Sequence, residues 1–241
     1  MQVSRNRDRS LYSQLLPAKA TFVTVNLTRA DLDISQDLLE HLQQSVTLVI
    51  HNAGPVNFNR KLQSLRPQLD GLINLMRFIT SAVTSPALFF VFTISSVLCH
   101  QSSGQRTPEN VINDDTAPGP NIYAQSMYVA ELLLEHAGCA IRLRKCFARV
   151  GHMAGSVNNP GLWNEAEWFP SLVIGSLHLG AIPDSIGSRF GKIDWADIDH
   201  LAGILTDLAL NESKGTNRER TVKRFVNPNY LKKTTCTCLT P

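Results

Sequence analysis

Short apolar runs alternate with longer amphipathic segments along the first part of the chain. Three runs rich in β-branched and aromatic residues have the length of a strand, namely Phe22–Val25, Thr47–Ile50 and Phe89–Ile94. Between the last two runs, Pro67 opens a segment whose apolar residues recur at helical spacing as far as Ile79. This spacing predicts a helix with one buried face and with proline in its tolerated first turn.

The alternation continues after a loop rich in proline and glycine. Tyr123–His136 repeats the helical spacing, and Ala140–Phe147 returns to the alternation of a strand. Lys192–Trp195 predicts a further strand, and Asp197–Leu210 predicts a last amphipathic helix. Strands and helices in this order indicate an α/β fold with a Rossmann-like, doubly wound parallel sheet.

The composition of the sequence changes near Gly151, and the expected division of the chain follows from that change. We expect residues 1–150 to form the Rossmann-like core and 151–210 to form a small substrate-side region with a returning strand and helix. Glycine, asparagine, proline and tryptophan are dense within that region, over Gly161–Pro170. Residues 211–241 are expected to be a C-terminal tail, part of which has no pattern that we can interpret.

Composition narrows the class of protein. The 241 residues are 43% hydrophobic and 18% charged, enough apolar material for a core and too little charge for disorder. The longest apolar stretch, around Ala87–Cys99, is too short to span a membrane, and no secretory signal opens the chain. The net charge of +3 and the five cysteines without CxxC spacing indicate neither a nucleic-acid partner nor a metal site. We therefore expect a cytoplasmic protein.

Tyr123 is the first candidate for chemistry, because it opens a predicted helix directly after the proline- and glycine-rich loop. A tyrosine in that position can donate a proton to a carbonyl group that is being reduced, provided that a nearby cation lowers its pKa from about 10. The residue one helical turn later is Met127, which supplies no charge. On spacing alone, a partly buried structural tyrosine with a local hydrogen-bond partner is the alternative interpretation.

Two strand ends carry further candidate residues. Thr93 and Ser95 lie where one predicted strand ends, and Asn52, Ala53 and Gly54 follow another. Ligands of open α/β sheets bind beyond the carboxyl ends of the strands. A hydroxyl group there can hydrogen-bond a substrate carbonyl or simply cap a turn, and small residues let the backbone approach a cofactor.

Several stretches, taken together, match one known family. In chain order they are VIHNAG (Val49–Gly54), LDGLINLMRF (Leu69–Phe78), FVFTISSV (Phe90–Val97), YAQSMYVAE (Tyr123–Glu131), RVGHMAG (Arg149–Gly155), GLWNEAEWFPSL (Gly161–Leu172), LGAIPD (Leu179–Asp184) and IDWADIDHLA (Ile193–Ala202). With these stretches the chain resembles the thioester reductase domain of fungal non-ribosomal-peptide-synthetase-like enzymes and adenylate-forming reductases, within the extended short-chain dehydrogenase/reductase group. The resemblance covers roughly Val3 to Pro228. The Gly161–Leu172 stretch argues against an epimerase or another dehydrogenase of that group.

The resemblance implies a Rossmann-type fold, NADPH as hydride donor, and reduction of a carrier-bound acyl thioester to an aldehyde or alcohol in secondary metabolism. The implied partner is a phosphopantetheinyl carrier domain that holds the acyl group. Tyr123 matches the catalytic tyrosine of the family. Thr93 best matches the catalytic hydroxyl residue, with Ser95 as the alternative in register.

The resemblance also implies residues that bind cofactor and substrate. The cofactor-binding residues would be Arg5, Asn52, Ala53, Gly54, Arg149, Val150 and Gly151. Arg5 falls where the family keeps an arginine for the 2′-phosphate of NADPH, a role that suits a planar, always-charged guanidinium. Trp163, Glu167 and Trp168 belong to the substrate-side region.

The sequence departs from the family pattern in ways that bear on activity. Met127 stands where the family has the lysine that binds the nicotinamide ribose and lowers the pKa of the tyrosine. The first strand–helix unit of the family, with its glycine-rich phosphate loop, would precede Met1 and is missing from the sequence. We therefore expect catalysis by this chain alone to be weak or absent. The alternative is a truncated, non-catalytic remnant or an interaction module of such a synthetase.

Overall fold

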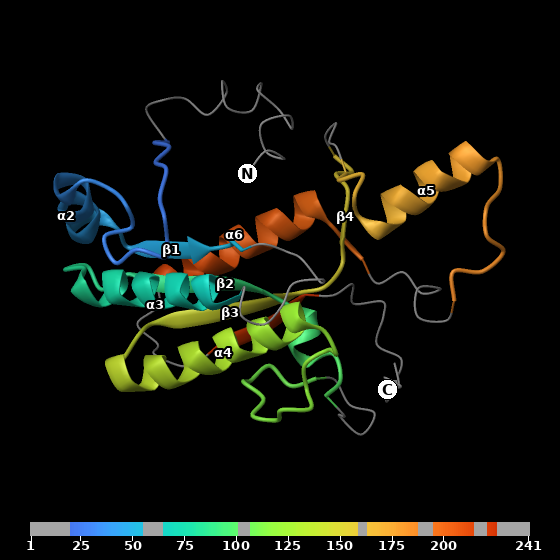
Figure 1. Ribbon diagram of the computed structural model, residues 1–241. Helices are drawn as coiled ribbons and strands as arrows, with labels where there is room; N and C mark the ends of the chain where they lie inside the picture. Colours follow the sequence, from blue (N-terminus) through green and yellow to red (C-terminus); the bar gives the residue numbers. More distant parts are fainter. Residues whose placement is uncertain are drawn as a thin grey trace.

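The computed structural model describes residues 20–54, 65–100, 107–158, 163–187, 195–214 and 221–225, the last five through their backbone. Their main element is a parallel sheet in the order β1-β2-β3-β6 (Figure 1). Its strands are β1 (Leu48–His51), β2 (Ala87–Thr93), β3 (Lys145–Val150) and β6 (Thr221–Phe225). A separate pair of short parallel strands joins β4 (Met153–Ala154) to β5 (Ala196–Asp197). The predicted α/β class is confirmed.

Helices cover both faces of the main sheet, which explains why its central strands are almost continuously apolar. On one face lie α2 (Gln36–Ser45), α3 (Arg66–Ser81) and α4 (Ile122–Ile141); on the other lies α6 (Ile198–Lys214). Successive residues of β2 point to opposite faces, so Phe90 packs in the cluster of α3 and α4 while Phe89 packs in the cluster of α6. The core is therefore two apolar layers separated by the sheet.

The predicted strand at Ala140–Phe147 is wrong over its first part. Helix α4 runs on to Ile141, Arg142 ends it in the left-handed region at φ 53°, and β3 begins only at Lys145. Helix α4 begins at Ile122, next to the predicted start at Tyr123. The Asn121 side chain caps this end by accepting from the Ala124 N–H at 2.8 Å. A short apolar run after a helix does not distinguish the last helical turn from a strand.

Other segments also differ from expectation. Phe22–Val25 lies in no strand, and Phe22 is 64% exposed. Most of the predicted strand Lys192–Trp195 lies outside the described residues, and the pairing occurs just after it, in β5. Helices α2 and α5 (Trp168–Leu179) were not predicted.

Two elements that follow residue 150 belong to or pack on the main sheet. Helix α6 packs on the main sheet, and β6 pairs with β3 inside it. Both elements therefore contact the core, although they come from the expected substrate-side region and tail.

A buried ion pair joins β3 to α4. The side chains of Arg149 and Glu131 are each 1% exposed. The arginine Nη2 donates to one carboxylate oxygen of Glu131, and Nε donates to the other at 3.2 Å. The remaining donors of Arg149 reach the carbonyl oxygens of Pro108 at 3.2 Å and Asn110 at 2.9 Å. Ser96 donates to Glu131 at 3.3 Å. One buried cation thus holds a strand, a helix and the loop before that helix together.

We expect Arg149→Leu to destabilise the protein by about 3–5 kcal/mol, because it leaves the Glu131 carboxylate buried without its cation. The double variant Arg149→Leu/Glu131→Leu should recover most of that loss, since it removes both buried charges. Urea unfolding followed by circular dichroism measures both effects. Arg66→Leu, which removes an exposed pair with Asp70, is the matched control and should change little. An Arg149→Leu protein as stable as this control would contradict the prediction.

Candidate functional site

The carboxyl ends of β1, β2 and β3 meet at one edge of the sheet, because the strands are parallel and in register. Thr93, the last residue of β2, lies directly opposite Val150, the last residue of β3, and Gly151 follows at the same edge. Asn52–Gly54 leave the end of β1 and are exposed there. The structure thus brings most of the sequence-predicted catalytic and cofactor-binding positions to this edge.

Thr93 caps the short 3₁₀ helix η2 (Ile94–Val97), which follows β2 directly. Its hydroxyl oxygen accepts from the Ser95 N–H at 3.2 Å and from the Ser95 hydroxyl at 3.0 Å. A hydroxyl group has one proton to donate and two lone pairs to accept with. Thr93 can therefore accept from Ser95 and still donate one hydrogen bond of its own. Thr93 and Ser95 remain the two alternatives in register.

Tyr123 lies in the first turn of α4, which the preceding loop holds against η2. The Gly119 N–H donates to the carbonyl oxygen of Ser95 at 2.8 Å, and the Cys99 N–H donates to that of Ala117 at 2.8 Å. Gly119 leaves no room for a larger residue without adjustment, because an added Cβ would stand 3.3 Å from Leu98 and 3.4 Å from Ala124. These contacts hold the segment that leads into α4 against η2, the short helix that follows Thr93.

The Tyr123 side chain packs on an apolar cluster. Its half-buried ring packs against the cluster that contains Met127, and burial raises the pKa of the phenol above its usual value. Met127, one turn later, is 4% exposed and supplies no charge. Among the side chains that the structure describes, the one lysine is Lys145, which binds the carbonyl of Leu134 at 2.7 Å and the carboxylate of Glu135 at 2.8 Å. That lysine lies toward the opposite end of α4, so it cannot take the role of a cation at position 127.

Arg149 and Arg5 are the two arginines that the family resemblance assigns to the cofactor. The guanidinium of Arg149 is buried on Glu131. A contact between this segment and a cofactor would therefore come from the backbone, or from Val150 and Gly151, rather than from the charge of Arg149. Arg5 lies outside the described residues.

His51 belongs to this edge, although the sequence analysis did not single it out. It is 6% exposed at the end of β1, and its ring meets the edge of Phe90 at a centroid distance of 4.6 Å. Burial lowers the pKa of its imidazole from 6.5 to about 4. The side chain is therefore neutral near neutral pH. Its place directly before the Asn52–Gly54 loop is the signal that could have found it.

The predicted substrate-side residues belong to an aromatic cluster that follows β3. Trp163, Trp168, Phe169 and Trp195 pack on one another at ring-centroid distances from 4.8 to 5.7 Å, together with His152. Because His152 follows Gly151, the cluster is tied to the carboxyl edge of the sheet. Figure 1 shows α5 on the side of the molecule toward which the strand arrows point.

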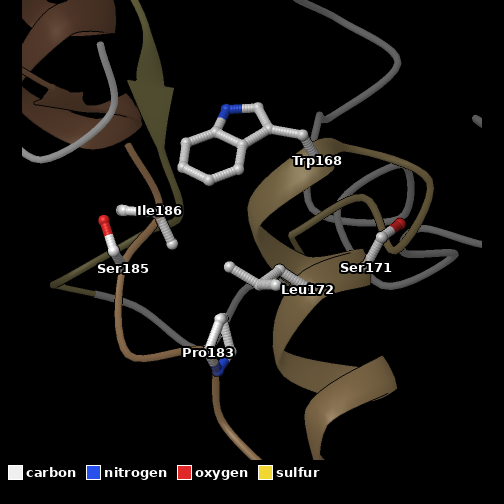
Figure 2. A pocket seen from close by; sticks show the side chains of 6 residues that line it. All are labelled: Trp168, Ser171, Leu172, Pro183, Ser185 and Ile186. Carbon is white, nitrogen blue, oxygen red and sulfur yellow. The ribbon is translucent and has the colours of Figure 1, made fainter. Parts of the chain in front are cut away.

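The three predicted substrate residues have different surroundings within this cluster. The Trp163 indole N–H donates to the Glu167 carboxylate at 2.7 Å, so these two side chains hold each other. Trp168 instead forms one wall of a cavity beside α5, which Figure 2 shows from close by. We call it the α5 cavity; it is lined by Trp168, Ser171, Leu172, Pro183, Ser185 and Ile186.

The described residues contain neither a cluster of metal-ligating side chains nor a membrane-spanning helix. No three histidine, cysteine, aspartate or glutamate side chains gather there as they would around a metal ion. In the same part of the chain, no helix combines the length and apolar character that crossing a membrane requires.

Comparison with known proteins identifies relatives of the chain. An NAD-binding family described as Male sterility protein matches residues 3–205. The carboxylic acid reductase of Neurospora crassa is 33% identical over 192 residues, which is 80% of this chain and 18% of that protein. The adenylate-forming reductase Nps10 of Heterobasidion annosum is 33% identical over 199 residues, 83% of this chain and 18% of that protein. The chain thus spans 18% of the length of these curated relatives.

Solved structures share the fold. The terminal R domain from the myxalamid PKS-NRPS biosynthetic pathway superposes with a TM-score of 0.73 at 22% identity, covering 91% of this chain and 52% of that one. The reductase domain of a non-ribosomal peptide synthetase from Mycobacterium tuberculosis gives 0.73 at 18% identity, covering 93% and 55%. The expected Rossmann-like fold and the expected resemblance to reductase domains are both confirmed.

We expect the stability of the protein to fall as the pH is lowered from about 7 to about 5, with about 2 kcal/mol of the loss due to His51. Its pKa is about 4 in the folded state and 6.5 ordinarily. In this range the unfolded chain therefore binds a proton that the folded chain does not, and the free energy of unfolding decreases with acidity. Urea unfolding at both pH values should show the loss reduced in His51→Leu. An NMR titration of the His51 ring with a midpoint near its ordinary value would contradict the prediction.

Proposed function

This chain belongs to the Male sterility protein family of NAD-binding domains, and we propose that it is an NADPH-dependent thioester reductase domain. It would reduce an acyl group on the phosphopantetheine arm of a carrier domain to an aldehyde or alcohol, in fungal secondary metabolism. The supporting observation is the arrangement at the carboxyl edge, where the Thr93 hydroxyl, the Tyr123 turn of α4 and the exposed Asn52–Gly54 loop lie together. Relatives named as carboxylic acid and adenylate-forming reductases support the same chemistry.

The residues at this edge fit a nicotinamide cofactor. Asn52–Gly54 present small, exposed positions directly after a strand, where backbone can approach a ligand closely. Gly54 is also constrained from the other side, because an added Cβ would come within 2.8 Å of the Gln68 side-chain nitrogen. We assign the backbone of Val150 and Gly151 to the same site, and Arg5 to the 2′-phosphate. The bound cofactor supplies the hydride.

Thr93 and Tyr123 would have different roles at the thioester carbonyl. Thr93 donates its free hydroxyl proton as a hydrogen bond to the carbonyl oxygen, which orients and polarises it. As hydride reaches the carbonyl carbon, Tyr123 gives its proton to the same oxygen. The carbon–sulfur bond then breaks, which releases the aldehyde and returns a proton to the thiol of the carrier. A second reduction of the aldehyde would give the alcohol.

This reaction should be slow in the present chain. A buried phenol whose pKa is raised holds its proton more tightly, and Met127 provides no positive charge to offset that effect. The charge of Arg149 is already neutralised by Glu131. The burial of Met127 in the apolar core also supports a second candidate function, a domain that binds its carrier partner without performing chemistry.

Steady-state assays with NADPH and a soluble acyl thioester test the proposal. We expect slow NADPH oxidation, which Tyr123→Phe lowers by about 100-fold or more because it removes the proton donor. Thr93→Val should lower it by about 100-fold by removing the hydrogen bond to the oxygen. Far-UV circular dichroism confirms that each variant is folded.

Position 127 gives the sharper comparison. Met127→Lys should raise turnover and lower the pKa of Tyr123, measured by ultraviolet titration of the phenolate, whereas the apolar control Met127→Leu should change neither. The lysine will cost stability because its ammonium enters an apolar environment, so both variants are assayed at a temperature where they are folded. NADPH oxidation that is equal in the wild type and in Tyr123→Phe would refute the assigned role. Saturable carrier binding without any oxidation would favour the non-catalytic function.

A further inference from the structure

Strand β1 lies at one side of the main sheet, where β2 is its one neighbour among the described strands. The Ala87 N–H donates to the Thr47 carbonyl at 3.1 Å, so the backbone of Thr47 faces β2. In a parallel strand the backbone groups of successive residues point alternately to the two sides. Those of Leu48 and Ile50 therefore face away from β2. We call this side, with the N–H and C=O groups of Leu48 and Ile50, the outer side of β1.

The outer side of β1 has the character of a pairing surface. Ile50 is 51% exposed. Edge strands that stay single are usually protected by lysine, other charges or proline, and the stretch from Thr47 to Asn52 contains none of these. His51, its one titratable residue, is neutral near neutral pH because burial lowers its pKa to about 4. Another strand is the partner that satisfies the backbone groups of such an edge together.

The chain itself contains a segment with the properties of that strand. Phe22–Val25 is rich in β-branched residues, and no charge or proline lies within it or directly beside it. Its four side chains are all exposed, and the segment forms no strand in the structure. Its length equals the four residues of β1. In an extended strand Phe22 would face one side of a sheet and both valines the other, so apolar side chains would reach both layers of the core.

The anchoring of this segment directs it away from β1 of its own chain. The Asn74 side chain of α3 donates to the Leu27 carbonyl at 2.9 Å, and a Cβ added to Gly71 of α3 would stand 3.0 Å from the Leu27 side chain. Helix α3 covers one face of the sheet, so Phe22–Val25 leaves from the helix layer and not from the side of β1. Figure 1 shows the segment, in blue, pointing away from the sheet. This anchoring favours a partner strand from another molecule.

We propose that two copies of the chain form a twofold dimer by strand exchange, in which Phe22–Val25 of each copy adds to the outer side of β1 in the other. Each contact then occurs twice, as a closed twofold assembly requires. Hydrogen bonds between the main chains supply the affinity, and the added strand covers the exposed Ile50 side chain. The inference depends on neither a cofactor nor the proposed reductase function, so it holds or fails independently of both.

Size-exclusion chromatography with light scattering, on the full chain over a dilution series, measures the assembly. We expect the mass to reach twice the 26.7 kDa of the single chain and to rise no further as the concentration increases. A monomer at every concentration would overturn the proposal. Growth beyond the dimer would overturn it as well, because reciprocal exchange leaves no further outer side to pair.

Ile50→Lys tests the acceptor side of the contact. It should weaken the dimer by about tenfold or more, because the added strand would have to cover an ammonium group. Ile174→Lys is the matched control, since Ile174 lies on α5 and is 48% exposed, against 51% for Ile50; it should dimerise like the wild type. Circular dichroism checks that both variants are folded. If Ile174→Lys weakens the dimer as much as Ile50→Lys does, or more, the proposal is wrong.

Val23→Pro tests the exchanged segment. Proline removes a backbone donor and interrupts a strand, so the dimer should weaken by about tenfold or more. Val23→Thr keeps a β-branched residue at the same position and should dimerise like the wild type. Urea unfolding of the monomeric fractions checks that the fold is retained, which we expect because Val23 lies outside the helices and strands. Wild-type dimer affinity in Val23→Pro would contradict the exchange.

Cross-linking distinguishes strand exchange from direct pairing of the two β1 strands. A short bismaleimide should join a Thr24→Cys copy to an Ile50→Cys copy when the two variants are mixed, and mass spectrometry identifies the joined peptides. The wild type gives the background from the native cysteines. Preferential joining of Ile50→Cys copies to each other would overturn the exchange. Joining of the two positions within one Thr24→Cys/Ile50→Cys chain would overturn it too, because the segment would then pair with its own β1.

Discussion

The buried pair of Arg149 and Glu131 is the interaction on which the rest of the candidate site depends. A guanidinium inside the protein is tolerated only when its charge and its donors are satisfied, and here a carboxylate and two loop carbonyls do so. The same carboxylate accepts a hydrogen bond from the Ser96 hydroxyl, which also lies 3.0 Å from the carbonyl oxygen of Thr93. Glu131 lies two helical turns beyond Tyr123. The ion pair therefore sets the end of β2 against the helix that bears the tyrosine.

Much of the fold could be predicted because its periodic patterns are long. The strand β2 and the helices α3 and α4 begin near the residues that their spacing indicates. The errors fall where pattern carries less information: Ala140–Phe147 continues a helix through a short apolar run, and Phe22–Val25 has strand-like residues but no strand partner among the described residues. Helix α5 is apolar on nearly all sides, so it shows no periodicity to detect.

The candidate site was predictable in outline but not in its electrostatics. Parallel strands bring their carboxyl ends together, so the joint location of Thr93 and the Asn52–Gly54 loop follows from the strand assignments alone. The direction of the Arg149 side chain does not, because it depends on a carboxylate eighteen residues earlier in another element. The burial of His51 depends in the same way on Phe90 of the neighbouring strand.

Position 127 shows how packing and chemistry compete for one residue. A methionine there is 4% exposed and adds to the apolar layer between α4 and the sheet, with no charge to hydrate. A lysine would place an ammonium one turn from the tyrosine, where it would favour the phenolate, but its own charged form would be disfavoured by the same burial. The apolar choice stabilises the core and at the same time leaves the pKa of Tyr123 raised. In this chain the apolar residue fills position 127, so the reductase that we propose would have no cation one helical turn from Tyr123.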